Sequence, residues 1–213
     1  MPIFCPICNK SSAQSRFFGA FCESCMAQKL KREIPKHARI YQCRFCERLK
    51  IKGTFYDYDK NSLGRALNVA MGLKDAKVIV EDFKSGWADV KIIFHREGEN
   101  IEVKAGVSVK VAHETCQKCY RISAGYYQGV IQVRGNRMKM ERFVEGLKRY
   151  VERRDGFISK IEDQQNGYDI YVSDKSVANS FFVERKIKVE KSFRFYGMKR
   201  GVKLYRNTYA VHL

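Results

Sequence analysis

The sequence predicts an α+β fold in three parts: a cysteine-rich N-terminal region, a β-rich middle segment with one helix, and a C-terminal ferredoxin-like βαββαβ domain. Three observations support this prediction. Eight cysteines form closely spaced pairs, apolar residues change from helical to alternating spacing in the middle of the chain, and helices and strands alternate after residue 120. We expect domains at residues 1–50, 51–120 and 121–213.

The eight cysteines all fall into four Cys-x-x-Cys pairs: Cys5/Cys8, Cys22/Cys25, Cys43/Cys46 and Cys116/Cys119. A redox Cys-x-x-Cys motif is usually seen once, at the start of a helix in a βαβ setting, whereas two such pairs supply the four thiolates of a closed tetrahedral zinc site. We therefore predict two structural Zn²⁺ ions in zinc-ribbon modules with four cysteine ligands each. Four pairs can combine in three ways, and we favour pairing in chain order. His37 and His113 lie near cysteine pairs, but eight cysteines already complete two sites.

The middle segment is expected to contain a helix and then three strands. Residues 62–73 place apolar side chains at helical spacing, with Ser62 as the N-cap. Residues 101–111 alternate apolar and polar side chains, which predicts a long strand with one buried face. The β-rich runs 77–83 and 87–95 precede it, so the segment is expected to form an antiparallel meander.

The C-terminal segment is expected to follow the order β-α-β-β-α-β with one additional strand. Strands are predicted at 126–134, 157–161, 168–172, 187–195 and 202–211. An amphipathic helix is predicted at 137–154 with Asn136 as its cap, and a second helix begins after Ser173 or Asp174. Asn166-Gly167 is a strong hairpin signal between two of the strands. This order is that of a split βαβ sandwich.

The net charge of +18 indicates a polyanionic partner, and charge alone allows RNA, DNA or an anionic membrane surface. Residues 1–50 carry a net charge of +7, residues 51–120 only +1, and residues 121–213 +10. No apolar run approaches the roughly 20 residues that cross a bilayer. The first residues lack a basic stretch followed by an apolar one, so we expect no secretory signal and a cytoplasmic location. We also expect a monomer that does not act on membranes.

Two groups of basic residues are candidate RNA contacts. The first flanks the third cysteine pair and comprises Arg39, Arg44 and Arg48. The second lies between residues 185 and 206, and comprises Arg185, Lys186, Lys188, Arg194, Lys199, Arg200, Lys203 and Arg206. Rings at Phe195, Tyr196 and Tyr205 are interleaved with the second group and could stack on bases. The alternative interpretation is a solvated basic face with these rings in the core.

Several separated motifs resemble the nonsense-mediated-decay-three family. They are the four cysteine pairs in this order and the segments 43–48 (CRFCER), 113–119 (HETCQKC), 131–134 (IQVR) and 167–171 (GYDIY). The resemblance covers nearly the whole chain. It implies a non-enzymatic factor that binds the nascent large ribosomal subunit, through its RNA and proteins, around the tRNA sites and beside the anti-association initiation factor. Eukaryotic members are export adaptors for that subunit.

The sequence departs from the eukaryotic pattern at its end. It stops at Leu213 in an expected strand, without an acidic or leucine-rich tail that could serve as an export signal. A short version of this kind is similar to archaeal members. We therefore expect a role in large-subunit biogenesis or in protection of the subunit's tRNA sites, and do not assume export.

An enzymatic role finds little support in the sequence. No Walker-type phosphate loop, nucleophile elbow or His-Glu-x-x-His motif occurs, and a zinc closed by four cysteines has no open position for water. We therefore expect no catalytic residues. Two alternatives stay open at this point: a zinc-ribbon RNA-modification enzyme, which would need a cofactor pocket, and a zinc-ribbon DNA-binding regulator, which would bind duplex DNA.

Overall fold

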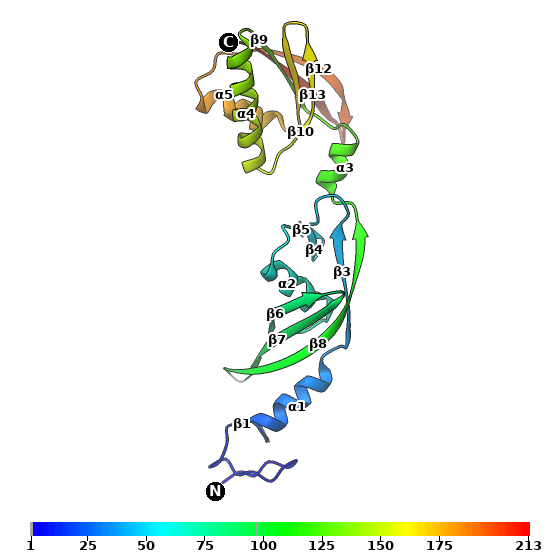
Figure 1. Ribbon diagram of the computed structural model, residues 1–213, viewed down its shortest axis with the longest axis vertical. Helices are drawn as coiled ribbons and strands as arrows, with labels where there is room; N and C mark the ends of the chain where they lie inside the picture. The colour runs from blue at the N-terminus through cyan, green and yellow to red at the C-terminus, as the bar shows by residue number, and fades with distance from the viewer. Residues whose placement is uncertain (1, 97) are drawn as a thin grey trace. The chain divides into compact units, whose positions relative to one another are not determined.

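The computed structural model describes residues 2–96 and 98–213, and the side chain of Lys199 lies outside this description. The chain folds into two compact units, Met1–Cys116 and Gln117–Leu213 (Figure 1). Both contain helices and β-sheet, so the α+β prediction is confirmed. No helix in the described part of the chain is long and apolar enough to cross a membrane.

The first unit begins with a small cysteine-bearing module. A bridge between Phe4 and Ser11 closes the first loop, and a short hairpin follows, formed by β1 (Phe17–Phe18) and β2 (Phe21–Cys22). Helix α1 (Glu23–Glu33) starts directly after β2. Its apolar side packs on the neighbouring sheet, because Leu30 and Ile34 belong to the same buried cluster as the strand residues.

A six-stranded sheet forms the rest of this unit, in the order β5-β4-β3-β8-β7-β6. Its strands are β3 (His37–Cys43), β4 (Leu49–Ile51), β5 (Thr54–Tyr56), β6 (Ala76–Lys84), β7 (Trp87–Arg96) and β8 (Glu99–Glu114). The expected meander is present as β6, β7 and β8. Strand β3 pairs in parallel with β8, and the boundary expected at residue 50 falls inside β4, which pairs with β3 in this sheet.

Helix α2 (Lys60–Ala70) covers one face of this sheet with Leu63, Ala66 and Leu67. It begins two residues before the expected start, and its N-cap is Asp59 where we had expected Ser62. Asp59 accepts a hydrogen bond from the Ser62 backbone at 2.5 Å, and the Ser62 hydroxyl accepts one from the Asp59 backbone at 2.9 Å. Both residues therefore form a reciprocal capping box, in which Ser62 is the third helical residue.

The second unit contains the expected order of elements. Short helix α3 (Gln117–Ser123) is followed by β9 (Gly129–Arg134), α4 (Arg137–Arg153), β10 (Ile158–Gln164), β11 (Gly167–Val172), α5 (Lys175–Glu184), β12 (Glu190–Lys199) and β13 (Val202–His212). Asn136 and Asp174 cap α4 and α5 as expected. At the predicted hairpin turn, a Cβ on Gly167 would overlap the Val133 carbonyl oxygen, so only glycine fits.

The additional strand lies inside the sheet, whose order is β10-β11-β9-β13-β12. In a simple βαββαβ sheet the fourth strand lies beside the first, but here β13 takes that place, parallel to β9, and β12 becomes the edge. Burial explains the exchange. Tyr209 and Val211 of β13 are each only 1% exposed, whereas residues 190–196 of β12 are all exposed.

Helices α4 and α5 cover one face of this sheet (Figure 1). Their buried side chains, including Leu147 and Phe181, form one core with strand residues such as Ile131 and Ile170. Because side chains alternate along a strand, the neighbouring positions point to the opposite face, which we call the open face. Its residues on β9 are only partly buried, unlike those that face the helices.

Candidate metal centres and nucleic-acid interface

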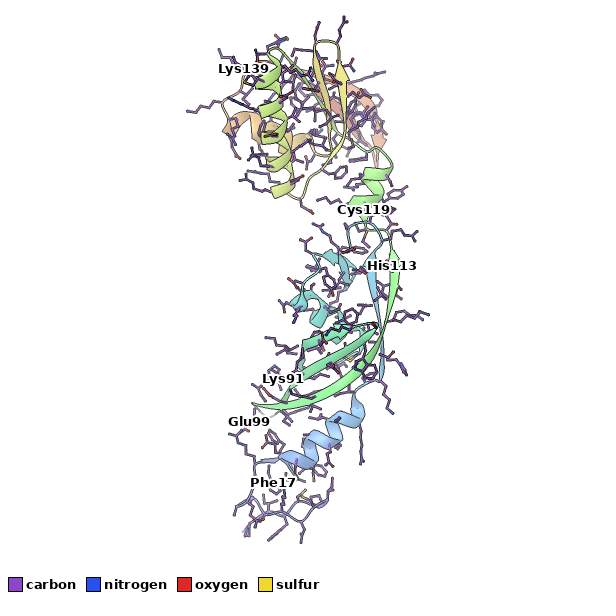
Figure 2. All side chains as sticks on the ribbon, in the orientation of Figure 1. Phe17, Lys91, Glu99, His113, Cys119 and Lys139 are labelled. Carbon is purple, nitrogen blue, oxygen red and sulfur yellow. The ribbon has the colours of Figure 1, made fainter. Side chains whose placement is uncertain are left out.

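The first cysteine cluster combines a turn with a helix start. Cys5 and Cys8 come from the first loop, Cys22 is the N-cap residue of α1, and Cys25 lies in the first turn of that helix. The four sulfur atoms lie within 4.8 Å of one another, and the Cys8 and Cys22 sulfurs are 3.4 Å apart. Phe17, labelled in Figure 2, and Phe21 pack against this cluster.

The second cluster results from the parallel pairing of β3 with β8. Because parallel strands end at the same edge, Cys43 at the end of β3 lies close to Cys116, which follows β8. The Cys116 backbone N–H donates to the Cys43 sulfur at 3.4 Å. Cys46 and Cys119 complete the cluster, again within 4.8 Å. The chain-order pairing is therefore confirmed.

Both clusters differ from a simple ribbon in the same way. One pair of each cluster lies in a turn, and the other pair lies at the start of a helix, α1 or α3. Free N–H groups and the helix dipole at such a start stabilise negative thiolates. His113 lies on β8 (Figure 2), and neither it nor His37 belongs to a described cluster, so the ligand sets contain cysteine alone.

Backbone hydrogen bonds and neighbouring thiols shift the pKa values of the clustered cysteines in opposite directions. Burial raises the pKa of Cys5, yet backbone hydrogen bonds, first that from Cys22, lower it to about 6. Backbone hydrogen bonds outweigh burial in the same way at Cys43, whose pKa is also about 6. Hydrogen bonding with Cys8, followed by burial, raises the pKa of Cys25 to about 12. Four adjacent thiols cannot all ionise unless a cation neutralises them.

The donor sets fit zinc. A tetrahedron of thiolates about 2.3 Å from Zn²⁺ places the sulfurs about 3.8 Å apart. The observed sulfur separations are 3.4 Å for Cys8 and Cys22 and 3.7 Å for Cys46 and Cys116. Two structural zinc sites, one per cluster, follow from these donors. Four protein ligands close each site, so zinc held there stabilises the fold.

Two family models match the chain. One, described as the NMD3 N-terminal domain, matches residues 5–124, and the other, described as the NMD3 second domain, matches residues 126–213. The chain belongs to the NMD3 family. This confirms the resemblance to the nonsense-mediated-decay-three family, whose members are associated with the ribosomal subunit. No curated protein matches the chain closely enough to count as a relative.

In this NMD3-family chain, the C-terminal candidate residues lie around the β12–β13 hairpin. Arg185 ends α5, Lys186 and Lys188 lie in the following loop, and the others lie on the hairpin and its turn. The exposed members are Arg185, Lys186, Lys188, Arg194, Arg200 and Lys203, and none of them pairs with a carboxylate in the described part of the chain. Lys199 ends β12, and its side chain lies outside the description.

The candidate residues near the second cluster are less uniform. Arg39 and Arg44 are exposed, on β3 and in the turn that holds Cys46. Arg48 instead donates to the Asp57 carboxylate at 2.7 Å, so an intramolecular ion pair already engages it. Arg39 and Arg44 are therefore the members of this group that are better placed to meet another molecule.

Sequence reasoning missed an aromatic row on the open face of the second unit. The rings of Tyr127 and Tyr171 meet edge to face, with centroids 4.9 Å apart. The Arg206 guanidinium carbon lies 4.0 Å from the Tyr127 ring centroid and 3.6 Å from that of Tyr196. Tyr127 and Tyr171 lie 44 positions apart in sequence, so only the strand register that brings β9 and β11 together reveals the row.

Proposed function

We propose that this chain is a non-enzymatic factor that binds the large ribosomal subunit in the cytoplasm and acts in its biogenesis or in protection of its tRNA sites. Membership of the NMD3 family supports an association with the ribosomal subunit. The basic surface described next supports binding to ribosomal RNA. The two closed cysteine sites support a structural role for the metal, because four sulfur ligands leave no position for a reacting water.

The unpaired cations of the C-terminal hairpin carry this proposal. Several cations elsewhere in the chain lie against carboxylates, as in the pairs Lys50–Glu114 and Arg134–Asp169, each at 2.7 Å. Between residues 185 and 206 the sole acid is Glu190, and the exposed cations there have no described carboxylate partner. Such a cluster repels itself in the free protein, and a phosphate backbone removes that repulsion.

Co-sedimentation with purified subunits tests the proposal. At low salt, the wild-type chain is expected to migrate with large subunits in a sucrose gradient and to stay at the top with small subunits. The test variant carries Arg194→Gln, Arg200→Gln and Lys203→Gln. Because three phosphate contacts are lost, binding should weaken and the slope of log K against log salt should become shallower by about 2.

A matched control carries Lys52→Gln, Lys74→Gln and Lys77→Gln. These three lysines lie in the nearly neutral middle of the sequence, outside both candidate groups, and their replacement changes the net charge by the same amount. This control should bind as the wild type does. Wild-type protein that does not migrate with large subunits would refute the proposed function. Equal binding by both variants would show that the hairpin cations do not contact the subunit.

A further inference from the structure

We propose that the open face of the second unit binds unpaired RNA bases by stacking, with Tyr196 as the receiving ring and Arg194 as a phosphate contact. This inference rests on the proposed function and specifies the form of RNA that one surface recognises. Three features carry it: the exposure of the ring, the order of the groups around it, and a pair of like charges beside it.

The position of the row follows from strand register. Tyr209 of β13 is buried on the helix side of the sheet, so Arg206, at an odd spacing from it, points to the open face. Tyr171 of β11 alternates in the same way with the buried Ile170 and Val172. Tyr196 lies at the bulge of β12, and its contact with Arg206 places it on this face as well.

The row is ordered before any ligand arrives. The Lys160 ammonium lies 4.3 Å from the Tyr171 ring centroid, Tyr171 meets Tyr127, and Arg206 lies over both Tyr127 and Tyr196. Arg206 also donates to the Tyr127 hydroxyl at 3.0 Å. A base that stacks on the end of this row therefore meets a ring already held by a cation, which reduces the entropy lost on binding.

Tyr196 is the end of the row that is open to solvent. Its residue is 57% exposed, whereas Tyr127, Tyr171 and Arg206 are partly buried. An exposed aromatic ring on an otherwise open sheet offers a flat surface to any base, because every base has a π face. The bases of a duplex are already stacked inside the helix and cannot use it, so the site favours single-stranded RNA.

Charge on the same face favours a phosphate beside the stacked base. Arg194 and Arg206 lie directly opposite each other in the β12–β13 pair, so two positive side chains are neighbours on the open face. Arg206 is held between two rings, whereas Arg194 is exposed and has no described carboxylate partner. On the part of the open face formed by β10 and β11, two acidic side chains already have cationic partners: Asp169 pairs with Arg134, and Glu162 pairs with Lys160.

The test compares single-stranded and duplex RNA on the whole zinc-loaded chain. Fluorescence anisotropy would follow binding of a labelled, unstructured RNA of about 10 nucleotides, within the usual range for one stacking platform, and of the same sequence as a duplex. Tyr196→Ala removes the ring, Tyr196→Phe keeps it, and Phe193→Ala is the matched control. Phe193 is 65% exposed on the same strand, but it pairs with Asn207 on the helix side.

Loss of one stacked base predicts about tenfold weaker binding of single-stranded RNA by Tyr196→Ala, with the salt dependence unchanged because no charge is lost. Tyr196→Phe and Phe193→Ala should bind single-stranded RNA as tightly as the wild type does. All three variants should bind the duplex with wild-type affinity. Single-strand binding by Tyr196→Ala at wild-type strength would overturn the inference, as would an equal loss for duplex. Reduced subunit binding with unchanged oligonucleotide binding would also overturn it and point to a protein partner.

This result is separable from the proposed function. If the chain binds single-stranded RNA through Tyr196 but does not migrate with large subunits, the proposed function fails and the stacking site stands. If it migrates with large subunits and Tyr196→Ala binds single-stranded RNA as tightly as the wild type does, the proposed function stands and the stacking site fails. Thermal unfolding of each variant checks that the fold is retained.

Discussion

Zinc removal is expected to unfold the first cysteine module and to leave the six-stranded sheet folded. The module has almost no apolar core of its own. Its buried cluster consists of the ligands Cys5, Cys22 and Cys25, with Phe17 and Phe21 only partly buried against them. The sheet instead has a continuous core in which side chains such as Leu67 and Ile92 are fully buried.

The free-energy contributions show why the module depends on zinc. Ordering roughly 20 residues costs about 20 kcal/mol at about 1 kcal/mol per residue. The three phenylalanine rings of the module, Phe17, Phe18 and Phe21, contribute at most about 9 kcal/mol, whereas a structural zinc contributes about 10–16 kcal/mol. With zinc, the terms nearly balance. Without zinc, the stabilising contributions fall short of the ordering cost by more than about 10 kcal/mol, so the module cannot stay folded.

Limited proteolysis with trypsin after treatment with a strong chelator checks this expectation. Lys10 and Arg16 lie between the two cysteine pairs of the module, and Lys91 and Lys104 lie within β7 and β8. Mass spectrometry should find rapid cleavage at the first two sites and protection at the other two. Adding zinc back should restore protection throughout.

A matched control separates the two zinc sites. Cys116→Ser removes a ligand of the second cluster only, so elemental analysis should fall from two zinc equivalents to one while Lys10 and Arg16 stay protected. The reasoning would be refuted if the metal-free wild type, with its zinc loss measured, resisted cleavage at Lys10 and Arg16.

Three further predictions concern the first unit. Leu67→Ala should lower the free energy of unfolding by about 3 kcal/mol because Leu67 is fully buried, whereas Val69→Ala on the exposed side of α2 should change it by less than about 0.5 kcal/mol; chemical denaturation measures both. Hydrogen bonds from Ser62 lower the pKa of the Asp59 carboxyl below its ordinary value of 3.8. The ionised carboxylate therefore stabilises the fold at any pH above 3.8, and this stabilisation is lost as the pH falls through the lowered pKa. In Asp59→Asn, unfolding followed between about pH 2 and 6 should lose that part of the acid dependence. Gly106→Ala should shift the emission of Trp87, the single tryptophan, because the new Cβ would overlap its ring; unchanged emission would contradict the packing.

Local signals predicted most of the second unit and the cysteine sites. Asn136 and the apolar face behind it identified α4, because capping and periodicity act within a few residues. Pairing of the cysteines in chain order was our preference among three combinations, and the spacing alone did not decide between them; the parallel pairing of β3 with β8 does. Helix α1 and strand β3 were not predicted, although Leu30 and Ile34 have helical spacing and Ala38 and Ile40 alternate; the cysteine motifs around them dominated the interpretation.

Long-range pairing was beyond the reach of local pattern. Residues 202–211 were predicted as a strand without a defined neighbour, and the choice between edge and centre depends on which strand buries more apolar surface against α4 and α5. The aromatic row has the same origin. Tyr127, Tyr171 and Arg206 come from three segments, so their contacts exist only once the sheet order is fixed.

The central position of β13 sets the order in which the second unit can assemble. Its parallel partner β9 begins 73 positions earlier in the sequence, and the edge strand β12 joins the sheet through β13. During synthesis, β9, β10 and β11 can pair as soon as they emerge, but β12 then has no partner until residues 202–212 follow it. Closing such a distant contact is slow. The last strand to be made thus completes the sheet, and Arg206 reaches Tyr127 and Tyr196 only at that final step.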